Sequence, residues 1–276
     1  MRLLAILAVL ALSLAAASSH AAIAPPPDGR PIVIGQSYTL DSKILGQTRR
    51  INVWLPADYA ASGKTYPVLI LLDGGEDEDF HTITGLASLG AYNRAADMIV
   101  VGVAGIDRRH DFTHRSSDPE DLKLAPTAGG SDAFRRFLIE EVKPYVAAHW
   151  RGNGDFGLIG ESFAALFIVE TFASTPEAFD RYIAISPSLW WERGAAGEAA
   201  ISRLDHFPTG ARSLYLTIGD EGGVMHDETY KLGAALKAHA PPHLRWSFAP
   251  LPDEMHSTIY HRAGQAGLRW TYPQPK

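Results

Sequence analysis

The stretch Gly157-Leu158-Ile159-Gly160-Glu161-Ser162-Phe163-Ala164-Ala165-Leu166-Phe167 decides the fold of this chain. An apolar strand pattern passes through Gly-x-Ser-x-Ala and continues as a helical pattern, which is the form of a nucleophile elbow. A serine on so sharp a turn stands clear of the backbone, and small neighbours let the strand and the helix pass close together. Ala164 stands where the usual motif has a second glycine. The other interpretation of Ser162 is the N-cap of an ordinary strand-to-helix connection, so the rest of the chain has to decide.

Strand and helix patterns alternate on both sides of this stretch. Continuous apolar runs such as 67–73 and 98–103 suit strands buried on both faces of a parallel sheet. Further strands are predicted at 50–55, 155–160, 181–186, 213–219 and 244–248, and the last helices at 227–240 and 257–270. This alternation predicts one α/β domain over residues 22–276 with a mostly parallel, doubly wound sheet.

Two local features complete this prediction. Pro144 should kink or end the helix that contains it. The polar segment 108–130 is predicted to be a long irregular loop, of the kind that often borders an active site.

The N-terminus has the pattern of an exported protein. Arg2 precedes the apolar run 3–17, and small residues follow, so residues 1–21 are predicted to be a signal peptide cut after Ala17 or Ala21. The run is short for a membrane span, although an N-terminal anchor is the alternative. The chain has no cysteine, which fits a periplasmic or secreted enzyme without disulfides. A net charge of -6 without a basic cluster argues against a nucleic-acid partner.

Four polar or glycine-containing features follow the ends of predicted strands. They are Gly74-Gly75, Ser162, Asp220-Glu221 and His256. Ligands of open α/β sheets collect at the carboxyl ends of the strands. The order of serine, then acid, then histidine along the chain is that of α/β hydrolases.

These residue types suit ester hydrolysis through an acyl-enzyme. A neutral imidazole, from His256, takes the proton of Ser162 and returns it to the leaving group. A carboxylate behind the imidazole holds its tautomer and stabilises the imidazolium. Backbone N–H groups must meet the developing oxyanion, and the candidates are Phe163 together with Gly75 or Gly74.

The acid and any metal are less well marked in the sequence. Glu221, Asp220 and Asp227 are all candidates for the acid, and each could instead be a turn or cap residue. The acidic segment 76–79 lacks the order of a cation loop, so a solvated loop is favoured. His110 and His114 are spaced by four residues in a segment without a helical pattern. No metal site or cofactor is therefore assigned.

Several motifs resemble the putative esterase family of α/β hydrolases, over about residues 38–270. The motifs are Tyr66-Pro67-Val68-Leu69-Ile70-Leu71-Leu72-Asp73-Gly74, Arg108-Arg109-His110-Asp111-Phe112-Thr113, Glu140-Glu141-Val142-Lys143-Pro144-Tyr145-Val146, Ser186-Pro187-Ser188-Leu189-Trp190-Trp191, Ile218-Gly219-Asp220-Glu221 and His256-Ser257. The family holds siderophore (enterochelin-type) esterases and several carbohydrate esterases. The resemblance implies the hydrolase fold, the roles of serine and histidine, and Glu221 as the preferred acid. Ala164 departs from the family pattern, as does Glu161 where the family often has histidine.

The substrate is predicted from the resemblance and from two side chains. Trp190 could wall a pocket for flat acyl or aryl groups, with Trp191 as an equal candidate and core packing as the alternative for both. Arg108 or Arg109 could meet an anionic or catecholate oxygen, unless both are solvated. The first expectation is therefore a siderophore trilactone, followed by feruloyl or acetyl sugar esters. Acyl transfer to another alcohol and a non-catalytic binding protein of the same fold are the other hypotheses.

Overall fold

The structure, a computed structural model, describes residues 28–274, so the predicted signal peptide lies outside the described residues. Of the described residues, 34–274 belong to one compact unit and 28–33 are not part of it. Within the described residues, no helix combines the length and apolar character needed to cross a membrane.

The compact unit is built on an eight-stranded sheet with the order β1-β2-β4-β3-β5-β6-β7-β8. Strand β2 pairs antiparallel with β1 on one side and with β4 on the other, and all the remaining pairs are parallel. This arrangement confirms the predicted mostly parallel sheet of the α/β-hydrolase fold. The strands are β1 (Gln36–Ser42), β2 (Gln47–Trp54), β3 (Tyr66–Leu72), β4 (Ile99–Val103), β5 (Gly152–Glu161), β6 (Arg181–Ile185), β7 (Arg212–Thr217) and β8 (Leu244–Phe248).

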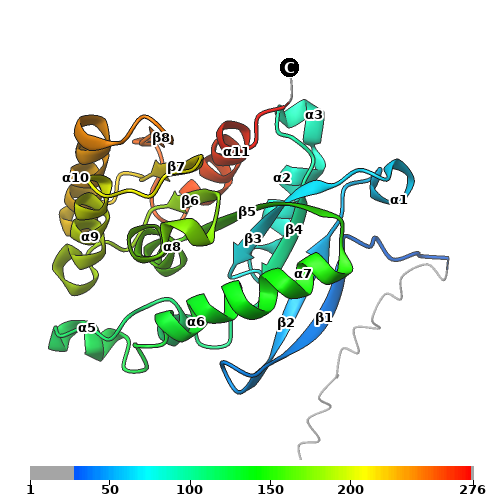
Figure 1. Ribbon diagram of the computed structural model, residues 1–276. Helices are drawn as coiled ribbons and strands as arrows, with labels where there is room; N and C mark the ends of the chain where they lie inside the picture. Colours follow the sequence, from blue (N-terminus) through cyan, green and yellow to red (C-terminus); the bar gives the residue numbers. More distant parts are fainter. Residues whose placement is uncertain (1–27, 275–276) are drawn as a thin grey trace, which may run out of the picture. The chain divides into compact units, whose positions relative to one another are not determined.

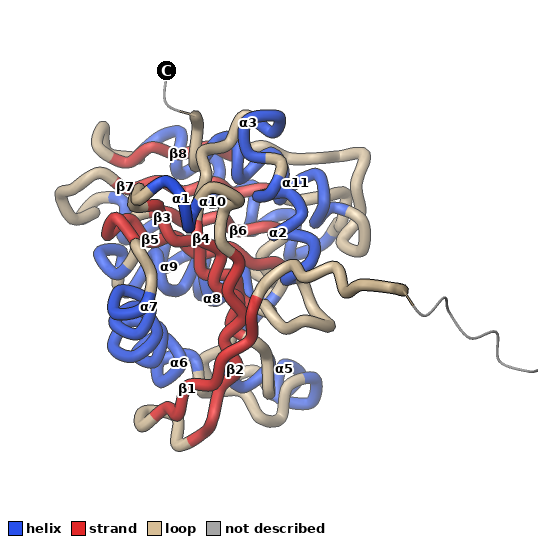
Figure 2. Tube along the Cα trace, turned by 90° about the vertical axis from the view of Figure 1, so that its right-hand side faces the viewer, coloured by secondary structure: helices blue, strands red, loops and turns tan. Residues whose placement is uncertain are grey.

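Helices lie on both sides of the sheet, which runs through the centre in Figure 2. The longer helical segments are α2 (Phe80–Ser88), α6 (Ser131–Phe137), a π-helical segment (Leu138–Val142), α7 (Lys143–His149), α8 (Phe163–Ser174), α9 (Ala195–Leu204), α10 (Gly223–His239) and α11 (Ile259–Thr271). Short helices are α1 (Tyr59–Ser62), α3 (Gly90–Asn93), α4 (Arg108–Asp111), α5 (Pro119–Leu124) and the 3₁₀ turns Pro176–Ala178 and Trp191–Gly194.

The pleat of the strands divides the core into two layers. In β3, Val68, Ile70 and Leu72 pack toward α6, α8 and α9, whereas Leu69 and Leu71 pack toward α2 and α11. Side chains that alternate along a strand point to opposite faces, and both faces of this strand are covered. The continuous apolar run of β3 is therefore explained by the burial of both of its faces.

The structure corrects several details of the sequence prediction. The segment 108–130 contains α4 and α5, and α4 is held by a fully buried ion pair in which Arg49 Nη1 lies 2.7 Å from Asp111 Oδ2. The edge strand β1 was missed because its polar, largely exposed sequence gives little hydrophobic pattern. The last two helices are α10 and α11, which begin at residues 223 and 259 instead of 227 and 257.

The helical stretch from α6 to α7 continues through Pro144 (Figure 1) instead of ending there. The Lys143 N–H bonds to Leu138 O in the π-helical turn, and Pro144 then stands at the start of α7. A proline lacks a donor and tolerates the first turn of a helix, where an N–H has no intrahelical acceptor. The wider π-helical turn therefore allows the helical stretch to continue past Pro144.

Candidate active site

Ser162 lies on a tight turn between β5 and α8. Its φ of 61° and ψ of -119° are unusual for a residue other than glycine, and such strain is held where the surroundings over-determine it. A Cβ atom on Gly160 would lie 2.6 Å from the Cβ atom of Ala164, so the pair has room for only one methyl group. Gly160 thus explains why Ala164 is tolerated where the motif usually has glycine.

His256 and Glu221 are brought together by two loops that follow β7 and β8. His256 Nδ1 lies 3.0 Å from Glu221 Oε2, and the Glu221 side chain is only 6% exposed. Asp220 is exposed, and Asp227 instead pairs with its neighbour His226 at 3.1 Å. Of the three acids considered from the sequence, Glu221 is therefore the one that hydrogen bonds the imidazole.

The pKa values of this pair shift in opposite directions. Burial alone would raise the pKa of Glu221, but hydrogen bonds from His256 and Ser186 outweigh burial and lower it. The hydrogen bond with Glu221 raises the pKa of His256, against the effect of burial. A carboxylate on Nδ1 leaves Nε2 as the nitrogen available to act as a base.

Two serines in the loop after β6 support the pair and Ser162, and the sequence analysis assigned neither of them a role. Ser186 Oγ donates to Glu221 Oε1, and Ser188 Oγ lies 3.3 Å from Ser162 Oγ. Both serines are buried, and the Ser188 N–H also bonds to Ser162 O at 3.2 Å. Their position at the carboxyl end of a predicted strand was the available signal, but pairing across loops cannot be read from sequence.

The predicted oxyanion donors differ in availability. Phe163 is the first residue of α8, so its N–H has no intrahelical acceptor. The Gly74 N–H bonds to Val103 O at 2.9 Å, and the Gly75 N–H bonds to Glu78 Oε2 at 2.7 Å. Gly74 is thus engaged within the sheet, whereas Gly75 is held by the carboxylate of the exposed Glu78, which also accepts from the Gly105 N–H at 3.1 Å.

Arg108 and Trp190, the predicted substrate-binding residues, both pack against Phe163. The Arg108 guanidinium lies 5.8 Å from the centroid of the Phe163 ring, and the Trp190 ring lies 5.6 Å from it, centroid to centroid. Arg108 also forms an ion pair with Asp73, with Nη2 2.9 Å from Oδ2, yet its side chain stays 41% exposed. Trp191 is fully buried, so Trp190 is the accessible tryptophan. Arg109 is exposed, and Arg108 is favoured over it because the Arg108 guanidinium packs against Phe163.

Glu161 places a further carboxyl group beside Ser162. Its Oε1 atom is buried and has no hydrogen-bond partner within the described residues. Burial raises the pKa of Glu161 to about 7, and the nearby carboxylates of Asp79 and Glu221 add to the rise, while His256 and Arg108 oppose it. The group is therefore close to half protonated at neutral pH, and its charge acts on His256.

The two histidines of segment 108–130 have carboxylate neighbours. His114 Nδ1 contacts Glu170 and its Nε2 contacts Glu192, so both ring nitrogens are engaged. His110 Nδ1 lies 3.0 Å from Asp111 Oδ1. Neither side chain contacts Ser162 or His256 in these interactions, and both lie on the side of the sheet that carries α8.

A protein-family model with the description "putative esterase" matches residues 42–242. The chain belongs to the putative esterase family. The matched residues include Ser162 and Glu221 but end before His256.

Curated relatives match about half of the chain. It is 30% identical over 159 residues to ferri-bacillibactin esterase BesA of Bacillus subtilis, covering 51% of this chain and 53% of that protein. It is 39% identical over 150 residues to the siderophore enterobactin esterase of Emericella nidulans, covering 48% of this chain and 49% of that protein. The chain thus spans about half the length of the curated relatives it matches.

Solved structures agree with the fold over most of the chain. An IroE-like serine hydrolase from Shewanella oneidensis has a TM-score of 0.77 at 25% identity, covering 85% of this chain and 79% of that chain. The BES protein from Bacillus cereus has a TM-score of 0.78 at 24% identity, covering 90% of this chain and all of that chain. The second likeness supports the fold alone.

Proposed function

We propose that this esterase is a serine carboxylic-ester hydrolase that acts through an acyl-enzyme, with siderophore trilactones as its first substrate class. The observation that carries the proposal is the elbow serine on the same sheet edge as a histidine whose Nδ1 hydrogen bonds a buried glutamate. The names of the curated relatives support the substrate class, because two of them are siderophore esterases.

In the proposed first step, His256 Nε2 accepts the proton of Ser162 Oγ as that oxygen attacks the ester carbonyl. Glu221 stabilises the imidazolium that forms, and Ser186 keeps the glutamate in place. The Phe163 N–H, and the Gly75 N–H once the Glu78 carboxylate has moved aside, donate to the oxyanion. The carbon–oxygen bond to the leaving group then breaks, and the imidazolium protonates the departing alkoxide oxygen to give the alcohol.

In the second step, water attacks the acyl-enzyme and His256 again acts as the base. The water proton passes to Nε2 and then to Ser162 Oγ as the acid product leaves. Another alcohol in place of water would give acyl transfer by the same steps. Product analysis in the presence of an acceptor alcohol distinguishes the two outcomes.

The residues around Phe163 support an aromatic acyl group with polar oxygens. Trp190 is partly exposed beside Phe163, and aromatic walls favour flat rings. The exposed part of the Arg108 guanidinium can meet an anionic or catecholate oxygen while its other face pairs with Asp73.

The activity is tested with p-nitrophenyl esters, acetylated or feruloylated sugars and a catecholate trilactone. Ser162→Ala should remain folded and lose on the order of 10³-fold or more in kcat. Near-normal ester turnover by folded Ser162→Ala protein would refute the assignment. Absence of turnover of every ester by the folded wild-type protein would favour a binding protein of the same fold.

The substrate class is tested separately. Trilactone hydrolysis should release dihydroxybenzoyl-serine units, and Trp190→Ala or Arg108→Ala should lower kcat/KM on the trilactone more than on p-nitrophenyl acetate. Arg109→Ala removes a neighbouring exposed arginine and is the matched control. Equal losses on both substrates, or rapid sugar deacetylation without trilactone turnover, would move the assignment to carbohydrate esters.

Export is a second part of the proposal, based on the signal-like pattern of residues 1–21. The mature chain should begin at Ser18 or Ala22, or close to them, in a periplasmic extract. N-terminal sequencing measures this directly. An intact Met1 on membrane-bound material would support the N-terminal anchor instead.

A further inference from the structure

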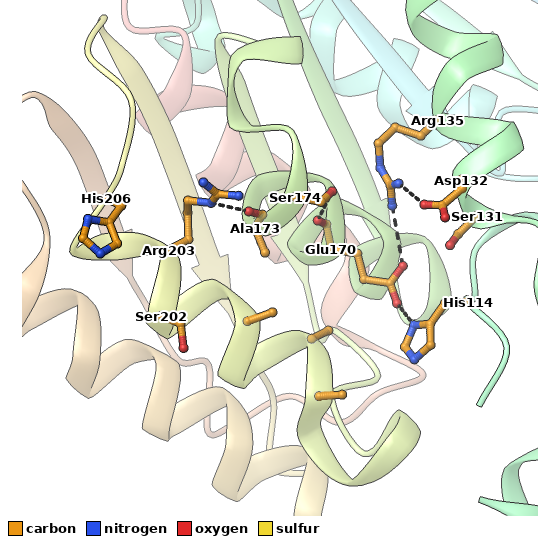
Figure 3. Close-up of a pocket in the computed structure, with 13 residues that line it drawn as sticks. His114, Ser131, Asp132, Arg135, Glu170, Ala173, Ser174, Ser202, Arg203 and His206 are labelled. Carbon is orange, nitrogen blue, oxygen red and sulfur yellow. Dashed lines mark hydrogen bonds and ion pairs between the residues drawn. The ribbon is translucent and has the colours of Figure 1, made fainter. Parts of the chain in front are cut away.

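A cavity of about 600 Å³ lies away from the candidate active site, between α6, α8 and α9 (Figure 3). Small-molecule sites in proteins commonly enclose about 300–1,000 Å³. The α8 residues that line the cavity are Glu170, Ala173 and Ser174. They follow Ser162 by eight residues or more, which is about 12 Å or more along a helix axis. The cavity is therefore a separate site from the elbow, although both use the same helix.

Along its length, between its two ends, the cavity is lined by small side chains. Ala173, Ala195, Ala196 and Ala199 provide methyl groups, and Ser174 directs its hydroxyl to Glu170 O at 2.8 Å. Such a surface suits an apolar chain or ring, because it offers contact area with few polar groups left to desolvate.

At one end of the cavity, the charges are already paired. The Arg135 side chain is 9% exposed and donates to Thr171 Oγ1 at 3.1 Å and to Asp132 Oδ1 at 2.5 Å. Glu170 Oε1 contacts His114, and Glu170 Oε2 lies 3.7 Å from Arg135. Figure 3 shows His114, Arg135 and Asp132 together around Glu170. This end has little free charge to offer to a ligand.

The opposite end presents a guanidinium with free donors. Arg203 Nε donates to Ala173 O at 2.6 Å, and within the described residues its two terminal nitrogens have no hydrogen-bond or ion-pair partner. His206 lies on the same side of the cavity as Arg203 in Figure 3 and is exposed. A planar guanidinium with two free nitrogens is suited to bind a carboxylate.

We infer that this cavity is a binding site for a small amphipathic carboxylate, with its carboxylate on Arg203 and its apolar body along the alanines of α8 and α9. His206 supplies a second donor at the same end, and the paired cluster at Glu170 and Arg135 closes the other end. The inference uses none of the residues of the proposed catalytic site and stands whether or not Ser162 is the nucleophile.

Octanoate is the probe for this site, and isothermal titration calorimetry on the full chain measures its binding. The neutral analogue octanamide should bind at least 10-fold more weakly, because it cannot form the ion pair with Arg203. Arg203→Gln should weaken octanoate binding at least 10-fold, whereas Arg136→Gln, which removes an exposed arginine paired with Glu140, should leave binding unchanged within twofold.

A second variant fills the cavity and guards against loss of folding in Arg203→Gln. Ala199 is exposed at the rim of the cavity, so Ala199→Trp should fold normally and abolish octanoate binding. Arg108→Gln changes the candidate active site and should leave octanoate binding unchanged. The inference is overturned if folded Ala199→Trp protein binds octanoate as the wild type does, if octanoate does not bind at all, or if Arg108→Gln removes the binding.

Discussion

His256 and His114 both contact carboxylates, but they are built for different tasks. His256 has Glu221 on Nδ1 and is 44% exposed, so Nε2 remains open to accept a proton. His114 has Glu170 on one ring nitrogen and Glu192 on the other. Burial opposes its charge, but these hydrogen bonds raise the pKa of His114 to about 9. His256 thus keeps one ring nitrogen free, whereas His114 is held in its charged form at neutral pH and links segment 108–130 to α8 and to the loop after β6.

The largest expected effect is a difference in kcat between a variant of His256 and a variant of His114. His256→Gln should lower kcat by on the order of 10³-fold or more with a small change in stability, because it removes the proposed base. His114→Gln should keep kcat within a few-fold of the wild type, because neither of its ring nitrogens faces the site. Ester turnover and thermal unfolding of the two variants measure the contrast. Equal losses of kcat in both would show that the comparison is wrong.

The next effect concerns the single carboxylate on His256. Glu221→Gln keeps the shape of the side chain but removes the charge that stabilises the imidazolium, so kcat should fall on the order of 10²-fold or more. Asp220→Asn and Asp227→Asn are controls on the same segment and should change kcat by less than about threefold. If Glu221→Gln proves the mildest of the three, Glu221 is not the acid.

His114, which is hydrogen bonded at both ring nitrogens, should instead affect the thermal stability of the protein. His114→Gln should lower Tm at pH 7 by roughly 5 °C, because it leaves the buried Glu170 with fewer partners. The pKa of His114 is raised above its ordinary value of 6.5, so its stabilisation is fully present below about pH 6.5 and is lost as the pH rises through about 9. Glu170, Glu192 and the adjacent Arg135 are the charged groups facing it.

Thermal unfolding of the wild type and of His114→Gln between pH 6 and 10 tests this expectation. The difference in Tm between the two proteins should shrink above about pH 9, while titration of other groups affects both alike. A difference that stays constant over this range would contradict a charged His114.

The smallest expected effect concerns how nearby charges set the pKa of His256. The ionised form of Glu161 raises the pKa of His256, and the Arg108 charge lowers it. Glu161→Gln should therefore lower the pKa of His256 and move the acid limb of the kcat/KM profile to lower pH, by less than about one unit. Glu254→Gln, which removes the ion pair of Glu254 with Arg262, is the control and should not move the limb. An unchanged limb in Glu161→Gln would mean that its carboxyl group is not charged when His256 titrates, and a shift to higher pH would contradict the expectation.

Much of this architecture could be predicted from local patterns. The apolar runs of β3 and β4 predicted a parallel sheet covered on both faces, because strands that do not alternate polar and apolar residues are buried on both sides. Gly160, Ser162 and Ala164 predicted the elbow, because only small side chains fit where β5 meets α8. The edge strand β1 and the helices α4 and α5 escaped prediction, because tertiary contacts such as the Arg49–Asp111 pair stabilise segments with weak local patterns.

The fold class, the elbow and the chain order of serine, acid and histidine could all be predicted from the sequence, since they depend on the period of the hydrophobic pattern, on residue size and on position in the chain. Tertiary contacts show that Glu221 hydrogen bonds His256, that Ser186 donates to Glu221 and Ser188 lies beside Ser162, and that Glu78 holds the Gly75 N–H. They also show that His114 is clamped at both nitrogens, by residues 56 and 78 positions away in the sequence. Hydrogen bonds between loops depend on how the strands are ordered in the sheet, and local sequence patterns carry no record of that order.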